Sequence, residues 1–534
     1  MTNLDADTKL DLNKTSYDDL PYANNAFSYA SPEHLNTVGK IFGLNPADVE
    51  TAKVLELGCG LGGNILGYAA RYPKSKVVGV DLSKVQIDEG NKLITQLGLT
   101  NIDLKAMDIV DIDDSFGKFD YIICHGFLSW VPKEIQDKMF HVAKHNLAPN
   151  GIAYVSYNTL PGWNIVGTFK EMLQYHTDTF KDVNDKLEQA RAFISFVQDG
   201  LSGSESPYYK FLENEAKIIS AADNSYLKHE YLDKGNTQFY FVEFMEMASK
   251  NGLAYLADTH LSNMYLGNLP EKAVEKLKTI NDIVRVEQYM DFVVNRRFRS
   301  TLLCHADSTI QRNIQPQALD DMWISMNIVS NTAVDKLDFK NESLTSSFTI
   351  RSVAGEVQCN PNGNFICAVL CAFSENNGGF LSIDEIAKYI KAKCPTFSAK
   401  DHLNGIKLEL VTLLFKGFLS VRSVKPLTVS KISDKPAISK LALLQIQNNL
   451  HMVFNQLNDS INVPMVHRIV MLNLDGKNTI AQIIDKVDDI LNKSGQQFQI
   501  DGKTVTDNEV KVRLIKDMVN NALQFCLAYA FLVG

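Results

Sequence analysis

The sequence predicts an α/β fold with a Rossmann-like, mostly parallel sheet in roughly its first 300 residues. Short apolar runs alternate with helical patterns, as expected of repeated strand and helix units. A turn rich in glycine follows the first run, and acidic side chains lie at the ends of successive runs. Because ligands of such sheets bind beyond the carboxyl ends of the strands, the fold class also predicts where a ligand site lies.

The glycine turn lies within residues 53–65, Lys-Val-Leu-Glu-Leu-Gly-Cys-Gly-Leu-Gly-Gly-Asn-Ile. It allows a ligand to approach the backbone closely and places that ligand at the positive end of a helix. Gly58, Gly60 and Gly63 also satisfy the G-x-G-x-x-G fingerprint. The glycines alone therefore leave a nicotinamide cofactor and S-adenosylmethionine as alternatives.

Acidic residues favour S-adenosylmethionine. Glu56 precedes Gly58 at the carboxyl end of the first strand, where it would attract the ammonium group of a methionine moiety and repel a pyrophosphate. Asp81 ends the second strand, 77–81, and is suited to accept both ribose hydroxyls of either cofactor.

The next two strands add further candidate residues. After a strand over 102–106, Asp108 and Ile109 suit the amino group and the ring face of an adenine. A fourth strand, 119–124, leads into His125, which either accepts a proton or holds the adenine or the loop by hydrogen bonds. The holding role is favoured because displacement by a neutral amine needs no base.

Eight longer motifs lie at residues 56–64, 79–83, 119–126, 129–132, 156–163, 229–232, 288–292 and 296–304. They resemble bacterial class I methyltransferases that carry a methyltransferase regulatory domain. Within that group, the chain is most similar to rickettsial protein lysine methyltransferases that act on outer-membrane proteins. The resemblance is dense from Tyr17 to Cys304 and thinner beyond, and Gln238 stands where the family would have proline.

The resemblance implies a seven-stranded sheet closed by a hairpin-like pair near 252–256 and 298–304, a helical insertion, and two further C-terminal α+β or helical domains. It also implies S-adenosylmethionine as cofactor and a homodimer formed through the insertion. The residues expected to bind the cofactor are Glu56, Gly58, Gly60, Asn64, Asp81, Leu82, Asp108, Ile109 and His125.

Four parts of the chain are expected. Residues 1–163 and 241–305 form the cofactor domain, 164–240 the insertion, 306–425 a middle domain and 426–534 a C-terminal domain. The strand and helix mixture of the middle domain resembles a winged helix, for which protein contact is favoured over nucleic acid because no dense basic stripe is present.

A heptad pattern runs through the insertion. Leu173, Phe180, Leu187, Ile194 and Leu201 recur every seven residues, which predicts a helical seam over 169–201. The partner of this seam is either another helix of the chain, such as 210–222, or a second subunit.

A methyl acceptor is expected at the ends of the fourth and fifth strands. Only about one lysine in a thousand is neutral near pH 7, so a lysine acceptor needs surroundings that disfavour its charge. Aromatic rings do so, and their faces bind the methylated ammonium product. The candidates are Tyr17, Tyr22, Trp130, Tyr157 and Trp163.

Composition narrows the function classes. The net charge of -9 argues against broad nucleic-acid binding. The eight cysteines show no Cys-x-x-Cys pair, so no metal site is predicted. Without a secretory signal or a membrane-spanning run, a cytoplasmic protein is expected. The leading interpretation is a methyltransferase for lysines of a large protein. A small-molecule methyltransferase and a non-catalytic cofactor-binding regulator are the alternatives.

Overall fold

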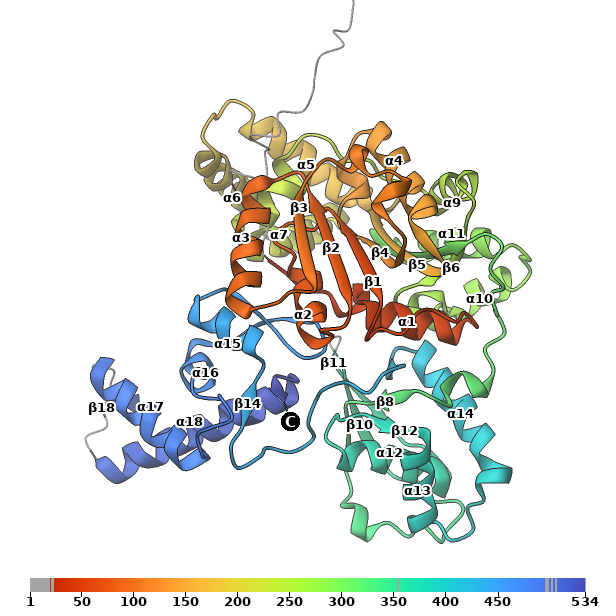
Figure 1. The fold of residues 1–534 in the computed structure, drawn as a ribbon, viewed down its shortest axis with the longest axis vertical. Coiled ribbons are helices and arrows are strands. Elements are labelled where there is room, and N and C mark those ends of the chain that lie inside the picture. Colours follow the sequence, from red (N-terminus) through yellow and green to blue (C-terminus); the bar gives the residue numbers. More distant parts are fainter. Residues whose placement is uncertain are drawn as a thin grey trace, which may run out of the picture.

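The fold is that of a computed structural model, which describes residues 20, 24–352, 355–494, 499–500, 503–504 and 507–533 (Figure 1). A seven-stranded mixed sheet with the order β3-β2-β1-β4-β5-β7-β6 lies at its centre. This confirms the predicted fold class. The strands are β1 (Lys53–Leu57), β2 (Lys76–Asp81), β3 (Ile102–Ala106), β4 (Phe119–Cys124), β5 (Leu147–Asn158), β6 (Leu253–Asp258) and β7 (Phe298–His305).

Strands β1 to β5 are parallel, and β7 runs antiparallel between β5 and β6. The carboxyl ends of the parallel strands therefore meet at one edge of the sheet, and the start of β7 joins them there. Ser156 of β5 pairs with Ser300 of β7, and Asn158 pairs with Phe298. This register brings the sequence after residue 297 beside the candidate acceptor region.

Helices cover both faces of the sheet. One face packs against α1 (Pro32–Ile41), α2 (Gly63–Arg71) and α3 (Lys84–Leu97), and its apolar core continues into the middle domain. The other face packs against α4 (Lys133–His145) and α9 (Phe241–Lys250). Alternate residues of each strand supply the two cores, as the pleat of a buried strand requires. Helices α10 (Glu271–Leu277) and α11 (Ile283–Val294) lead into β7.

The insertion differs from the continuous seam that the heptad pattern predicted. The chain leaves the helix after α5 (Trp163–Thr177) and starts again at α6 (Val183–Gly200), so Phe180 lies in the break. Asp182 causes the new start, because its carboxylate accepts hydrogen bonds from the backbone N–H groups of residues 184 and 185. The chain continues through α7 (Pro207–Ala221), α8 (Asn224–Tyr226) and a π-helical segment, Leu227–Leu232.

The buried seam residues find partners within the chain. Leu173, Leu187 and Ile194 join one apolar cluster with Leu212 and Ile219 of α7. Of the two partners that the sequence left open, a helix of the same chain therefore covers this part of the seam.

The described residues of the middle domain form two three-stranded sheets and three α-helices. In Figure 1 it lies on the side of the sheet where α1 is drawn. Its elements are β8 (Trp323–Ser325), β9 (Ile328–Ser330), β10 (Phe348–Ser352), β11 (Gly355–Cys359), α12 (Asn364–Glu375), β12 (Leu381–Ser382), α13 (Ile383–Lys393), α14 (Ala399–Phe415) and β13 (Ser420–Arg422).

The C-terminal part has its own apolar core and is closed by pairing of its first and last strands. It contacts the cofactor domain where Lys440 donates to the backbone carbonyl of Leu97 in α3 (2.7 Å). Over the described ranges, none of the helices has the length and apolar character that crossing a membrane requires. The elements of this part are β14 (Ala437–Ile438), α15 (Lys440–Gln447), β15 (Met452–Phe454), β16 (Ser460–Asn462), α16 (Met465–Met471), α17 (Ile480–Ser494), β17 (Gln499–Ile500), β18 (Lys503–Thr504), α18 (Asn508–Ala528) and β19 (Leu532–Val533).

Candidate functional site

The glycine turn connects β1 to α2 with a backbone that ordinary residues adopt only under strain. Gly58, Gly60 and Gly62 have φ values of 69°, 53° and 78°. A Cβ atom on Gly58 would lie 2.7 Å from the Phe127 ring, so glycine is also needed there for space. Because α2 begins at Gly63, its N-terminal N–H groups lie next to this turn, which suits a ligand with a negative group.

Glu56 is a buried carboxylate whose hydrogen bonding is incomplete. It is 4% exposed, and its Oε1 accepts a hydrogen bond from Nδ2 of Asn64 (2.9 Å). Its Oε2 has no hydrogen-bond partner among the described residues. The pKa of Glu56 is raised to about 8, because burial and, to a smaller extent, the nearby Asp81 charge outweigh the lowering effect of the Asn64 hydrogen bond. A ligand ammonium group would satisfy Oε2 and favour the charged form.

Asp81 connects the end of β2 to the glycine turn. Its Oδ2 accepts from the backbone N–H of Gly60 (2.8 Å), and its Oδ1 accepts from that of Ser83 (2.8 Å). Both bonds fix the half-buried carboxylate beside the glycine turn, and Leu82 lies half-buried next to it. The residues predicted for the methionine and ribose parts of the cofactor thus lie together.

The predicted adenine residues follow β3. Asp108 is half-buried and caps the short 3-10 helix η2 (Ile109–Asp111), because its carboxylate accepts a hydrogen bond from the N–H of Val110 (3.1 Å). The side chain of Ile109 is only 7% exposed and packs into the core on the α4 side of the sheet. Asp108 therefore remains the more accessible of the two.

His125 lies in an aromatic cluster at the end of β4. Its ring centroid is 4.0 Å from that of Phe27, in the segment before α1. Burial lowers the pKa of His125 to about 4, so the ring is neutral near pH 7. Its Nδ1 lies 2.8 Å from the Tyr154 hydroxyl, which donates to Ser300 (3.0 Å). The neutral ring is thus held in place through its Nδ1 by the Tyr154 hydroxyl, which agrees with the favoured holding role.

A cavity of about 310 Å³ lies next to this cluster. The Tyr29 ring connects the two, because its centroid is 6.0 Å from that of His125 and 4.7 Å from that of His260. The cavity lies at the start of β7 and after the end of β6, at the acceptor edge of the sheet. Its lining residues are Tyr29, His260, Ser262, Asn263, Phe298 and Ser300.

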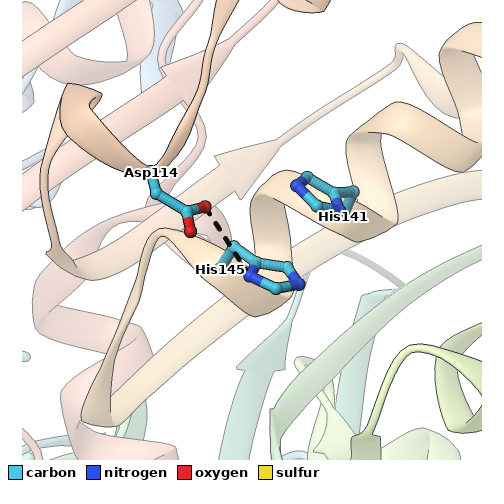
Figure 2. Close-up of side chains that lie close together, drawn as sticks. All are labelled: Asp114, His141 and His145. Atoms are coloured by element: carbon cyan, nitrogen blue, oxygen red, sulfur yellow. Dashed lines mark ion pairs between the residues drawn. The ribbon is translucent and has the colours of Figure 1, made fainter.

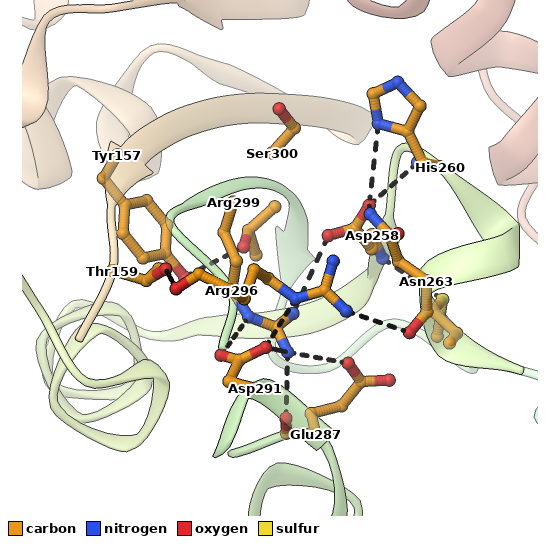
Figure 3. A network of polar contacts seen from close by, with 12 residues as sticks. Tyr157, Thr159, Asp258, His260, Asn263, Glu287, Asp291, Arg296, Arg299 and Ser300 are labelled. Atoms are coloured by element: carbon orange, nitrogen blue, oxygen red, sulfur yellow. Dashed lines mark hydrogen bonds and ion pairs between the residues drawn. The ribbon is translucent and has the colours of Figure 1, made fainter. Parts of the chain in front are cut away.

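Beneath the cavity, a buried arginine binds several acids (Figure 3). Arg299 is 1% exposed and contacts Asp291 (2.7 Å) and Glu287 (2.9 Å) of α11. It also lies 3.7 Å from Asp258, at the end of β6. Asp258 in turn accepts from the N–H of His260 and from Nδ2 of Asn263, both on the cavity wall. The network thus fixes this wall.

Two predicted acceptor residues lie together elsewhere. The rings of Trp130 and Trp163 meet edge to face at 6.4 Å, and both pack against the core of the insertion. Nζ of Lys170 lies 5.0 Å from the Trp130 ring centroid, so a cation of the chain itself already contacts this ring. Nε1 of Trp163 is buried and lacks a partner among the described residues.

Tyr157 does not line a channel as the sequence suggested. Tyr157 is 1% exposed, and its ring stacks on that of Phe244 in α9 with 4.1 Å between the ring centroids. Its hydroxyl forms a hydrogen bond with the Thr301 hydroxyl (3.0 Å). The reason is the pleat of β5, because Tyr154 and Ser156 face His125 and Tyr157 points to the opposite face. The remaining candidates, Tyr17 and Tyr22, lie outside the described residues.

The sequence analysis missed several residues around His125. Tyr154 carried a signal, since its two-residue spacing from Ser156 places both on one face of β5. Tyr29 belongs to the aromatic segment before α1. His260 and Phe298 gave no local signal, because only the pairing of β6 and β7 with β5 brings them here.

One further cluster is separate from this site. Asp114, His141 and His145 bring three metal-type ligand atoms within 4.8 Å of one another, the one such group in the described part of the chain (Figure 2). His145 Nδ1 and Asp114 Oδ1 are 3.6 Å apart, and their side chains are 46% and 73% exposed. The cluster lies at the amino ends of β4 and β5, the sheet edge opposite the glycine turn. It takes no part in the site above.

Comparison with known proteins identifies families that match three parts of the chain. A methyltransferase domain family matches residues 54–151, and the families described as "Predicted methyltransferase regulatory domain" and "PKMT, C-terminal winged helix domain" match 223–305 and 434–531. The winged-helix match thus falls on the C-terminal part, whereas the sequence had suggested such a module in the middle domain.

Two individual relatives are similar to this protein over nearly its whole length. The solved structure of PKMT2 from Rickettsia typhi in complex with AdoHcy is 42% identical, with a TM-score of 0.89, and the match covers 96% of this chain and 100% of that one. The uncharacterized protein RP789 of Rickettsia prowazekii is 40% identical over 92% of this chain and 89% of its own length. The chain therefore belongs to the family of rickettsial protein lysine methyltransferases, which are class I S-adenosylmethionine-dependent enzymes.

Proposed function

We propose that this protein transfers methyl groups from S-adenosylmethionine to lysine side chains of a large protein substrate. The observation that carries the proposal is the buried carboxylate of Glu56 beside the glycine turn, one oxygen of which has no hydrogen-bond partner among the described residues. An aromatic cavity lies at the same edge of the sheet. The first feature suits the ammonium group of the cofactor, and the second suits an aliphatic amine. The relative from Rickettsia typhi has AdoHcy bound, which supports the same ligand class here.

Polar side chains of this protein would bind three parts of the cofactor. Glu56 would receive the ammonium group, and Asp81 the ribose hydroxyls. Asp108 would accept from the adenine amino group, and His125 would order the loop next to it. Bound there, the cofactor would supply an activated methyl group: in-line attack of a neutral amine on the methyl carbon would break its bond to sulfur and release S-adenosylhomocysteine. Alignment of the amine is then the main contribution of the protein.

The acceptor lysine would enter the cavity between Tyr29 and Phe298. Beneath the cavity, Asp258, Glu287 and Asp291 bind Arg296 and Arg299, and this network would hold the wall that the lysine passes. Within the cavity, aromatic walls and the nearby sulfonium disfavour the ammonium form, so the lysine loses its proton before transfer.

We also propose the kind of protein substrate and the oligomeric state of the enzyme. The substrate is an outer-membrane or other surface protein that the enzyme meets in the cytoplasm before export, while the substrate is unfolded. The enzyme acts as a homodimer through its helical insertion, without nucleic acid. The support for these assignments is the resemblance to the rickettsial enzymes, together with exposed aromatic side chains on the insertion.

The test uses methyl-labelled S-adenosylmethionine, the purified protein and fractionated cell extract, followed by hydrolysis and amino-acid analysis. We expect label in methyl-lysine of a large protein, lost on Glu56→Ala and on Asp81→Ala. The exposed Asp103→Ala, on β3, serves as the matched control and should leave labelling unchanged. Label confined to small molecules would support a small-molecule methyltransferase. Cofactor binding without any transfer would support a regulatory protein.

A further inference from the structure

A hairpin of the C-terminal part docks directly on the helix that follows the glycine turn. The hairpin consists of β15 and β16, and its loop, 455–459, lies against α2. Asn458 donates from Nδ2 to the backbone carbonyl of Asn64 (3.0 Å) and lies 3.4 Å from its Oδ1. Arg71, at the other end of α2, donates to Oδ1 of Asn458 (3.3 Å). Both polar atoms of the Asn458 side chain thus bind one helix.

Asn64 connects Asn458 to Glu56, the carboxylate proposed to bind the cofactor. Asn64 donates from Nδ2 to Glu56 (2.9 Å), and its Oδ1 accepts from the N–H of Phe27 (3.1 Å). Asn64 is therefore bonded to Asn458 on one side and to Glu56 on the other, and it is 4% exposed. In a buried chain of this kind, the loss of one partner leaves the next group free to turn.

Hydrogen bonds of Asn455 fix the conformation of the loop that contacts α2. Oδ1 of Asn455 accepts from the N–H groups of Leu457 (2.9 Å) and Asp459 (2.8 Å), and its Nδ2 donates to the carbonyl of Tyr529 (3.0 Å). Asn458 is 0% exposed and has a φ of 65°, a conformation that asparagine tolerates better than most residues. The loop therefore presents one fixed side chain to α2.

Two further features match the docked position. A Cβ atom on Gly67 would lie 2.7 Å from Oδ1 of Asn458, so the helix has no side chain where the loop approaches. Ser460, at the base of the loop, accepts from the N–H of Ala26 (2.7 Å), in the segment whose Phe27 packs on His125. The hairpin thus contacts both sides of the candidate cofactor site.

We propose that Asn458 is a positioning residue of the cofactor site, through which the C-terminal hairpin holds Asn64 and the Glu56 carboxylate in the orientation that receives the ligand's ammonium group. This rests on the proposed cofactor site, but it assigns a role in that site to a part of the chain nearly 400 residues away. The C-terminal part then contributes to cofactor affinity without touching the cofactor.

The test measures binding of S-adenosylhomocysteine to the full-length protein by calorimetry. Asn458→Gly keeps the left-handed backbone and removes the side chain, and Gly67→Ala displaces the side chain while favouring the helix. Each is expected to weaken binding about tenfold, the usual effect of losing one buried hydrogen bond. Asn449→Gly, at an exposed left-handed asparagine of the same part, and Gly405→Ala, at an open helical glycine, are the matched controls.

A second measurement separates positioning from a merely structural role. Asn64 lowers the pKa of Glu56, so freeing Asn64 should raise the pH at which affinity stops increasing. A variant that only loosens the fold would lower the melting temperature and leave this pH unchanged. If both variants bind as tightly as the parent, or if the pH profile does not move, the positioning role is overturned. Failure of the parent protein to bind the ligand would instead overturn the proposed cofactor site.

Discussion

At the scale of single residues, Glu56 is subject to opposite demands in the free and the liganded protein. Burial favours its neutral form and raises its pKa to about 8, whereas an ammonium ligand requires its charge. The carboxylate is thus a cost to the fold that the ligand offsets. Such a conflict is expected where a residue is retained for binding rather than for stability.

The stability of Glu56→Gln relative to the parent should therefore depend on pH. The carboxyl titrates near 4.5 in the unfolded chain and near 8 in the folded one. Between these values the folded state holds the extra proton, so the parent loses stability as pH rises, and the variant does not. We expect the advantage of Glu56→Gln in urea unfolding without ligand to grow from pH 5 to pH 8. The exposed Glu50→Gln is the control, and a difference independent of pH would contradict the argument.

The cavity residues should affect the acceptor and not the cofactor. The rings of Tyr29 and Phe298 line the cavity, and one cation–π contact contributes about 0.5–2 kcal/mol. Phe298→Ala is expected to lower kcat/KM for the protein substrate by about tenfold and to leave the affinity for S-adenosylhomocysteine within about twofold. Phe292→Ala, at an exposed ring of α11, is the control. Equal losses in turnover and cofactor affinity would place Phe298 in the cofactor site.

At the scale of elements, local sequence predicted the strands well. The bounds of β4 agree with its apolar run, because a strand buried on both faces needs nearly continuous apolar residues. The bounds of the edge strand β3 agree with the alternation of buried Ile102 and Leu104 with the exposed Asp103. Glu56 and Asp81 followed from the same reasoning, since strand ends place their side chains at the ligand edge. These features depend on neighbours within a few residues.

Three features could not be predicted from the apolar pattern of nearby residues. The heptad pattern did not reveal the break at 178–182, where capping by Asp182 overrides the apolar period. The face on which Tyr157 lies depends on the pleat of β5 relative to α9. Asn458 lies almost 400 residues from Asn64 in sequence, so no local pattern connects them.

The Arg299 network joins three elements, β6, β7 and α11, and makes an element-scale prediction. Arg299→Leu would leave Asp291 and Glu287 buried without their partner, which costs about 3–5 kcal/mol of unfolding free energy. Burial raises the pKa of Glu287, so the loss should shrink toward acidic pH, where this carboxyl takes up a proton more readily. Chemical denaturation at pH 5 and pH 8 measures it, with the exposed Arg285→Leu on α11 as control. A loss that is the same at both pH values would mean that packing, not charge, is what the arginine supplies.

At the scale of the whole molecule, one apolar core extends from the cofactor domain into the middle domain and reaches Leu441 and Phe454 of the C-terminal part. The insertion differs, because its helices form a separate cluster. On its outer surface, Tyr175 is 88% exposed and Phe196 is 71% exposed. Aromatic side chains with this exposure are typical of a surface that a partner covers.

The proposed homodimer would form through this exposed face of the insertion. Replacing Phe196 with glutamate would place a charge in a contact that must exclude water, so Phe196→Glu should shift the protein from dimer to monomer. Light scattering after size-exclusion chromatography measures the mass directly, over a range of concentrations. Leu427→Glu, at a leucine that is 53% exposed outside the insertion, should leave the dimer intact. If the parent protein has the mass of a single chain at every concentration, the dimer is refuted. If the variant instead stays dimeric, the subunits meet on another face.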